Sequence, residues 1–148
     1  MHVTAPMLLA VLLLSNVACA RHQTDSASTN SQQTNRDQWQ PSNSIPGGFR
    51  CDLVGDPRQS GPFKYQLKIP AGTRVAAHRH SQDVRVKVLS GSMFIIIGEP
   101  LESSRARRFA AGSVFLVSAQ AWHDEWWDEE TVVEAEGVGL METVYKSQ

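Results

Sequence analysis

The stretch IPAGTRVAAHRHSQDVRVKVLSGSMFIIIG (residues 69–98) alternates short runs of β-branched and aromatic residues with small turn residues. This pattern predicts short strands that are separated by tight turns. The same pattern continues on both sides, so we expect strands at 63–69, 73–80, 84–89, 93–97, 114–117, 131–138 and 140–145. Sustained helical periodicity is absent, and it is absent from the polar segment 99–108 as well. The chain is therefore predicted to be all-β, in a sandwich, jelly roll or barrel.

Two histidines lie two positions apart within the predicted strand 73–80, as His78 and His80. Side chains two apart on a strand project from the same face, so both imidazoles can reach one point in space. Zinc, manganese, iron, nickel and copper all accept imidazole ligands, which makes such a pair half of a metal site. A pair on an exposed strand can equally remain solvated, so this spacing alone leaves both interpretations open.

Glycines placed around these histidines extend the pair into two motifs. In order along the chain, the positions are Gly72, His78, His80 and Gly91 in the first motif, and Gly112 and His123 in the second. With this spacing, residues 49–145 resemble the small single-domain cupins of bacteria. The resemblance implies a jelly-roll barrel, or double-stranded β-helix, that closes around one divalent metal ion. It also implies that His78, His80 and His123 are the ligands of that ion.

Several positions depart from the motifs of that family. Val84 stands where the first motif has a glutamate ligand, so the resemblance implies a site of three histidines. Such a set is similar to that of thiol dioxygenases and of a diketone-cleaving dioxygenase, which bind ferrous iron. The residues do not distinguish iron, manganese, zinc and nickel. Ser118, Gln120 and Trp127 replace turn and loop residues of the second motif, which is expected to reshape a loop. A barrel that has lost its metal remains the alternative.

Carboxylates that follow the third histidine are candidates for further site residues. If the chain is extended past His123, Glu125 and Trp127 share its inward face, which makes Glu125 a candidate catalytic general base. Glu134 and Glu136 share one face of the next predicted strand, at positions that line the cavity in similar cupins. For all of these glutamates, an orientation toward water stays open.

Three tryptophans crowd the segment around His123, namely Trp122, Trp126 and Trp127. Packing in the core or at its rim is the commoner role for such residues. The alternative is that they cover the mouth of a cavity or stack on a planar ligand.

The amino-terminal end has a different composition. Residues 5–15 form an apolar run that is too short to span a bilayer and suits an export signal, which we place at residues 1–20. Residues 21–48 are predicted to be a flexible polar tether, because they are rich in Ser, Thr, Gln and Asn up to residue 44. The remaining residues, 49–148, are predicted to form the folded domain.

Two processing sites compete at the end of the signal. Cleavage after Ala20 produces a soluble exported protein. A lipobox-like sequence instead makes Cys19 the lipidated first residue of a membrane-anchored periplasmic lipoprotein, and the polar tether favours this alternative. Either event leaves Cys51 as the one remaining thiol, so we expect a small buried residue and no intrachain disulfide.

Charge and composition reduce the number of possible functions. The formal net charge of −1 argues against nucleic acid as a partner. Two functions of different classes remain. The first is a binding or sensing module, displayed by its tether, that holds a small molecule through the metal or the tryptophans. The second is a metal-dependent, dioxygenase-like enzyme with Glu125 as general base. The export signal favours the binding module, and a homodimer stays open.

Overall fold

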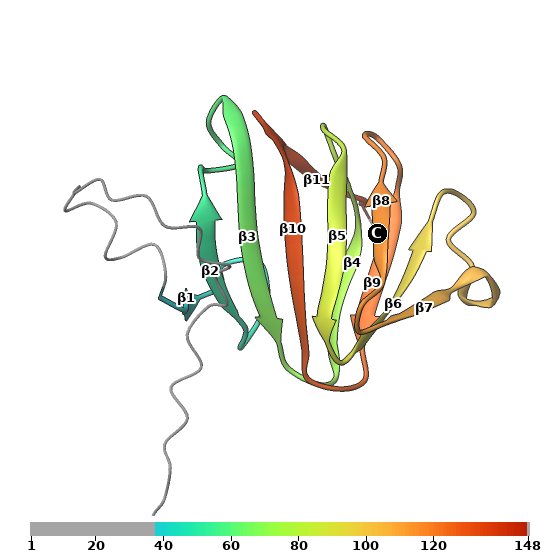
Figure 1. Ribbon diagram of the computed structural model, residues 1–148. Coiled ribbons are helices and arrows are strands. Elements are labelled where there is room, and N and C mark those ends of the chain that lie inside the picture. Colours follow the sequence, from blue (N-terminus) through green and yellow to red (C-terminus); the bar gives the residue numbers. More distant parts are fainter. Residues whose placement is uncertain (1–37, 148) are drawn as a thin grey trace, which may run out of the picture.

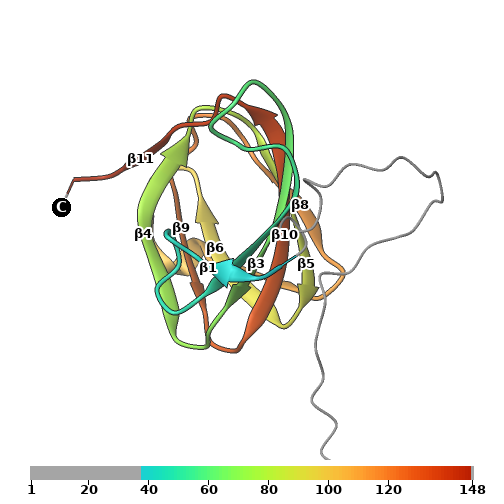
Figure 2. The ribbon, with the colours of Figure 1, turned by 90° about the vertical axis from the view of Figure 1, so that its left-hand side faces the viewer.

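Two antiparallel sheets face each other around a shared interior (Figures 1 and 2). The structure, a computed structural model, describes residues 38–147. The six-stranded sheet has the order β1 (Gln40–Pro41), β2 (Phe49–Val54), β3 (Gly61–Ile69), β10 (Thr131–Gly139), β5 (Val84–Ser90) and β8 (Val114–Val117). The five-stranded sheet has the order β11 (Thr143–Tyr145), β4 (Thr73–His80), β9 (His123–Trp127), β6 (Ser92–Ile97) and β7 (Arg107–Ala110). The predicted all-β class is confirmed.

Within residues 38–147, helical structure is limited to the short 3-10 turn η1 (Ser103–Arg105). In this same part of the chain, no helix has the length and apolar character needed to cross a membrane.

Strand β10 shows how the sequence pattern builds the interior. It pairs with β3 on one side and with β5 on the other. Thr131, Val133 and Ala135 are buried, because alternate side chains of a strand point to the same face of its sheet. On this inward face, Val133 packs with apolar residues of the opposite sheet into a core that includes Val75, Met93, Ile95 and Trp127. The two sheets are therefore joined by an apolar interior.

The motif glycine Gly91 has a physical role in the turn between β5 and β6. Its φ angle is +71°, a left-handed conformation that side chains rarely adopt. A Cβ atom at this position would lie 2.5 Å from the backbone oxygen of Glu130 and 2.6 Å from Oγ1 of Thr131. The turn thus brings β6 against the start of β10 at a distance that only glycine allows.

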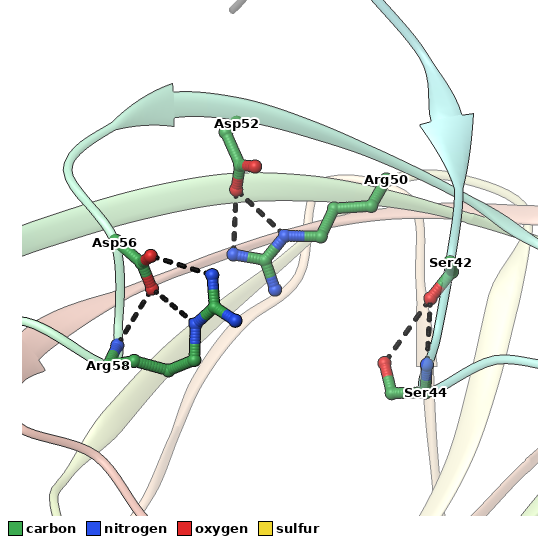
Figure 3. Close-up of polar contacts among 6 residues, drawn as sticks. All are labelled: Ser42, Ser44, Arg50, Asp52, Asp56 and Arg58. Carbon is green, nitrogen blue, oxygen red and sulfur yellow. Dashed lines mark hydrogen bonds and ion pairs between the residues drawn. The ribbon is translucent and has the colours of Figure 1, made fainter.

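The structured domain begins earlier than the boundary predicted between residues 48 and 49. Strand β1 pairs with β2, and Ile45 is buried in the core at 3% exposure. The intervening turn is held by Ser42, whose Oγ atom accepts a hydrogen bond from the backbone N–H group of Ser44 (Figure 3). It accepts another from the backbone N–H group of Ile45. The apolar side chain of Ile45 therefore anchors the last part of the predicted tether to the barrel. The predicted signal and the rest of the tether lie outside the described residues.

Cys51 on β2 is completely buried, as expected for a small apolar residue. It is disulfide-bonded in the full chain. The expectation of a single remaining thiol concerned the chain after cleavage of the signal, so it stays a prediction for that form. Cys19 lies outside the described residues.

Candidate metal centre

The histidine pair reaches the interior because β4 contains a β-bulge. Val75 pairs with Glu125 on β9, but His78 then pairs with His123, so β4 holds one extra residue in between. A bulge shifts the alternation of side chains by one position. Val75 and His78 therefore both face the interior, with exposed fractions of 8% and 4%, although an odd number of positions separates them.

His78, His80 and His123 come together at one point inside the barrel. The ring centroids of His78 and His123 are 4.1 Å apart, and those of His80 and His123 are 5.1 Å apart. One nitrogen from each ring lies within 4.8 Å of the other two, a spacing that can hold one metal ion. Two neighbouring strands, β4 and β9, thus bring together the three side chains that the sequence motifs predicted.

Hydrogen bonds fix which ring nitrogen of His78 and His123 is free. The Nδ1 atom of His78 lies 2.8 Å from the carbonyl oxygen of Ala76, and that of His123 lies 3.0 Å from the carbonyl oxygen of Ala121. A carbonyl oxygen can only accept, so both Nδ1–H groups donate. Each Nε2 atom then carries a lone pair, which is the tautomer that a metal-binding histidine needs.

His80 is supported by the last strand of the chain. Its Nδ1 atom lies 3.0 Å from the Oγ1 atom of Thr143 on β11, which pairs with β4. Tyr145 on the same strand places its ring centroid 5.5 Å from that of His78. Neither Thr143 nor Tyr145 was predicted as a site residue. Their position depends on the pairing of two strands that are distant in sequence, which the residues of β11 alone do not reveal.

Burial makes the three imidazoles weak bases. Desolvation, with a smaller contribution from the neighbouring histidines, lowers the pKa of His80 to about 3 and that of His123 to about 4. Desolvation likewise lowers the pKa of His78. The rings are therefore neutral near pH 7 and carry no proton that a cation would have to displace. In donor type and charge, the three residues fit one divalent ion, and His78 and His123 also have the tautomer that such an ion needs.

Glu125 lies on β9 on the same inward face as His123 and Trp127, as predicted. Burial, with a smaller effect of the neighbouring charge on Asp124, raises the pKa of the Glu125 carboxyl to about 7. The carboxyl group forms no hydrogen bond or ion pair with the described part of the chain. An isolated carboxyl in such surroundings can hold or release a proton near neutral pH. Its catalytic role remains a prediction.

A cavity of about 760 Å³ opens beside this cluster. Its wall includes His78, His80, Glu125, Tyr65, Val75 and Arg50. Metal-ligating nitrogens, a carboxyl group and apolar surface therefore share one space of the size that small-molecule sites have.

Two arginine–aspartate pairs lie at the β2 side of this cavity (Figure 3). The Nε and Nη2 atoms of Arg50 both lie 2.7 Å from Oδ1 of Asp52. Arg58 forms a two-oxygen pair with Asp56, at 3.0 Å to Oδ1 and 2.8 Å to Oδ2. Hydrogen bonds from Arg58 lower the pKa of Asp56 to about 2. Arg50 was not among the predicted site residues, because β2 itself was not among the predicted strands.

Glu134 and Glu136 do not line the cavity. They point to the outer face of the six-stranded sheet, since the buried residues of β10 are the ones between them. Glu134 accepts a hydrogen bond from Nε2 of Gln66 at 3.0 Å, and Glu136 pairs with Lys64 at 2.7 Å and Arg85 at 2.6 Å. The carboxylates therefore have partners on this face, and the alternative in which they lie inside is wrong.

Val84 and the three tryptophans around His123 pack against other side chains. Val84 is buried at 3% exposure with Phe63 and Tyr65, so its side chain faces the interior as the motif alignment predicts. Trp127 belongs to the apolar core. Trp126 stacks on Phe94, with ring centroids 5.4 Å apart, and the guanidinium of Arg79 lies 4.9 Å from the ring of Trp122. Packing, the commoner of the two expected roles, describes these contacts.

Comparisons with known proteins show which solved structures share this fold. No family profile matches the sequence, and no curated protein matches it. Among solved structures, a putative acetylacetone dioxygenase from Methylibium petroleiphilum PM1 is similar, with a TM-score of 0.60 and 18% identity over 83% of this chain and 85% of that one. The G106A mutant of salicylate 1,2-dioxygenase from Pseudoaminobacter salicylatoxidans, in complex with gentisate, has a TM-score of 0.59 and 15% identity over 74% of this chain. The match spans 32%, about a third, of the salicylate dioxygenase chain.

A conserved protein of unknown function from Streptococcus pyogenes is also similar, with a TM-score of 0.52 and 18% identity over 66% of this chain and 76% of that one. At these identities the likeness concerns the fold. Together with the two facing sheets, it shows that this chain is a small domain of cupin-like fold. Its cluster of three histidines could hold a metal ion.

Proposed function

We propose that this domain is a metal-dependent enzyme of the dioxygenase type that acts on a small molecule. The observation that carries the proposal is the shared cavity: two of the three clustered histidines and the partnerless carboxyl of Glu125 line the same space. A module that only binds a ligand has no need of a carboxyl group held without a partner beside a metal site. The fold-level likeness to two dioxygenases agrees with this proposal.

The Nε2 atoms of His78, His80 and His123 would hold one divalent ion, and iron is the metal that dioxygenase chemistry favours. When bound, such an ion supplies open positions for substrate and dioxygen. The protein's own groups then act on the substrate. Glu125 accepts or returns a proton, and the apolar wall near Val75 excludes water.

The metal is the first quantity to measure. Protein purified without a histidine tag is expected to contain close to one equivalent of metal, and His78→Ala, His80→Ala and His123→Ala are each expected to lose most of it. Arg79→Ala is the matched control, because Arg79 points to the opposite face of β4. A His123→Ala variant that keeps a full equivalent would contradict the assignment of the site.

The chemistry is tested separately. The iron-loaded protein is expected to consume dioxygen when a small organic substrate is added, and pentane-2,4-dione, salicylate and gentisate are suitable first probes. Glu125→Gln is expected to keep the metal but to lose at least about 100-fold in rate, the usual contribution of a general base. Zinc as the bound metal, with no oxygen uptake, would instead support the binding or sensing module.

We further propose that the protein is exported, on the basis of the apolar run at residues 5–15. The intact mass of the protein made in its host distinguishes a lipidated Cys19 from cleavage after Ala20. Cys19→Ser is expected to move the protein from the membrane to the soluble fraction. Equal fractionation of both forms would support cleavage after Ala20.

A further inference from the structure

We propose that Arg50 binds the carboxylate group of the small-molecule ligand and that the ligand's apolar part packs on the neighbouring cavity wall. This inference rests on the proposed function and extends it, since it names the chemical class of the ligand. Arg50 lies on β2, pairs with Leu67 of β3 and shares the cavity with His78 and His80. Its side chain is 25% exposed, so a ligand in the cavity can reach it without leaving the barrel.

The hydrogen-bond donors of Arg50 are only partly used. A guanidinium group has two edges that can each grip a carboxylate, one made by Nε and Nη2 and the other by Nη1 and Nη2. The first edge is occupied by a single oxygen of Asp52. The second edge, with both Nη1–H groups and one Nη2–H, has no partner among the described residues (Figure 3). The free edge offers two parallel N–H groups, which is the geometry that a carboxylate recognises.

Two contacts hold this edge in place. The guanidinium carbon of Arg50 lies 3.8 Å from the ring centroid of Tyr65, which stacks beneath it and is itself buried at 8% exposure. Asp52 holds the guanidinium from the side. An arginine that is fixed by an aromatic ring and a carboxylate loses little side-chain entropy when it binds a ligand.

Arg58, the second arginine of the cavity wall, differs from Arg50 in its exposure and in its contacts with a carboxylate. Its side chain is 84% exposed, and both oxygens of Asp56 engage it. Such an exposed pair is solvated and contributes little to ligand binding. Arg50 is therefore the residue that we assign to recognition.

The rest of the wall defines the remainder of the ligand. Tyr65, Leu67, Val75 and Met141 contribute apolar surface to the cavity. A single free guanidinium edge suits a singly charged carboxylate, whereas a phosphate dianion is normally held by more donors than this edge supplies. The expected ligand is thus a small carboxylic acid with an apolar body.

The experiment uses the full chain after removal of metal with a chelator. Binding of acetate, benzoate and phenylacetate is measured by calorimetry and compared with binding of the matched amides, acetamide, benzamide and phenylacetamide. At least one carboxylate is expected to bind about tenfold or more tightly than its amide, the usual effect of a charge-assisted hydrogen bond. Arg50→Gln is expected to remove this preference. Arg85→Gln, which loses the same charge on the outer face, is expected to keep it.

Arg50→Lys guards against a folding defect, because it keeps the charge beside Asp52 but lacks the planar edge. It is expected to lose most of the preference while it unfolds at the wild-type temperature. The proposal is overturned if wild-type protein shows no carboxylate preference, if Arg50→Gln keeps it, or if inorganic phosphate binds more tightly than every carboxylate. Since no metal is present, these outcomes concern Arg50 alone, whereas the metal content tests the proposed function.

Discussion

Val84 stands at the position of a carboxylate ligand in related motifs, and its side chain is buried next to Tyr65 and Ala135. Val84→Glu is expected to destabilise the metal-free protein by on the order of 3 kcal/mol, because it buries an unpaired charge. Added metal is expected to restore much of this loss, since a carboxylate is a good ligand for iron, manganese and zinc. Thermal unfolding with and without metal measures both effects.

Val84→Gln separates charge from size at this position. It should destabilise the metal-free protein less than Val84→Glu, and metal should rescue it less. Equal unfolding temperatures of metal-free wild type and Val84→Glu would mean that a glutamate at residue 84 escapes to solvent, against the burial of Val84 in the structure.

Glu125 gives the metal-free protein a specific pH dependence. Its pKa is raised to about 7 in the folded state, above the usual 4.5. The folded state therefore holds a proton that the unfolded state has released, and stability contributed by this group falls as the pH rises from 4.5 to 7. As the pH rises over this window, the free energy of unfolding of Glu125→Gln is expected to increase relative to that of wild type by up to about 3 kcal/mol.

Chemical denaturation at several pH values measures this difference. The histidines shift stability in the opposite direction, but they are present in both proteins and largely cancel in the comparison. A difference that stays constant between pH 4.5 and 7 would contradict the raised pKa of Glu125.

Sequence reasoning was most successful at the scale of single residues in motifs. Strand alternation places His78 and His80 on one face, and the resemblance to cupin motifs adds His123; the structure brings the three together. Alternation also places Glu125 on the face of His123, while its role stays a prediction. Glu134 and Glu136 could not be assigned to a face in this way. Alternation shows that they share a face, but only the packing of β10 shows that this face is the outer one.

Short edge strands were the hardest elements to predict. Strand β7, with the sequence RRFA, overlaps the end of the polar segment 99–108 and was not among the predicted strands. It forms because it pairs with β6, and its one aromatic residue, Phe109, stacks on Phe115 with ring centroids 4.1 Å apart. Arg107 and Arg108 keep this edge charged, which is how natural sheets avoid pairing with other chains. Contacts between distant segments, rather than local propensity, decide such elements.

Deletion of strand β11 tests whether this whole strand supports the metal site. A chain that ends at Met141 removes Thr143, the hydrogen-bond partner of His80. The barrel is expected to fold, because the residues of β11 are exposed and pair only with β4. Metal affinity is expected to fall by about 10- to 100-fold, as it does when the hydrogen-bond partner of a ligand is lost.

Thr143→Ala and Thr143→Ser resolve the cause of that loss. Thr143→Ala should reproduce most of the effect, whereas Thr143→Ser keeps the hydroxyl group and should retain the wild-type affinity. If the truncated chain binds metal as tightly as wild type, β11 does not support the site.

For the whole molecule, the metal site joins two elements of one sheet, and the sheet in turn packs on its partner. Metal that binds only the folded state is expected to raise the free energy of unfolding by about 2.7 kcal/mol at a free concentration of 100 times Kd. Unfolding curves recorded at increasing metal concentration should show this dependence. His123→Ala is the control, and it should unfold at a temperature that metal does not change.

The bulge in β4 has a consequence for protein engineering. Residues 75–78 place one apolar and one imidazole side chain on the same side of the strand, three positions apart, opposite a regular stretch of β9. A designer who grafts the histidine cluster onto another barrel must therefore transfer these four residues as a unit together with their partner strand. Copying the histidines alone into a regular strand at this spacing would point them at solvent whenever the apolar residue stays inside.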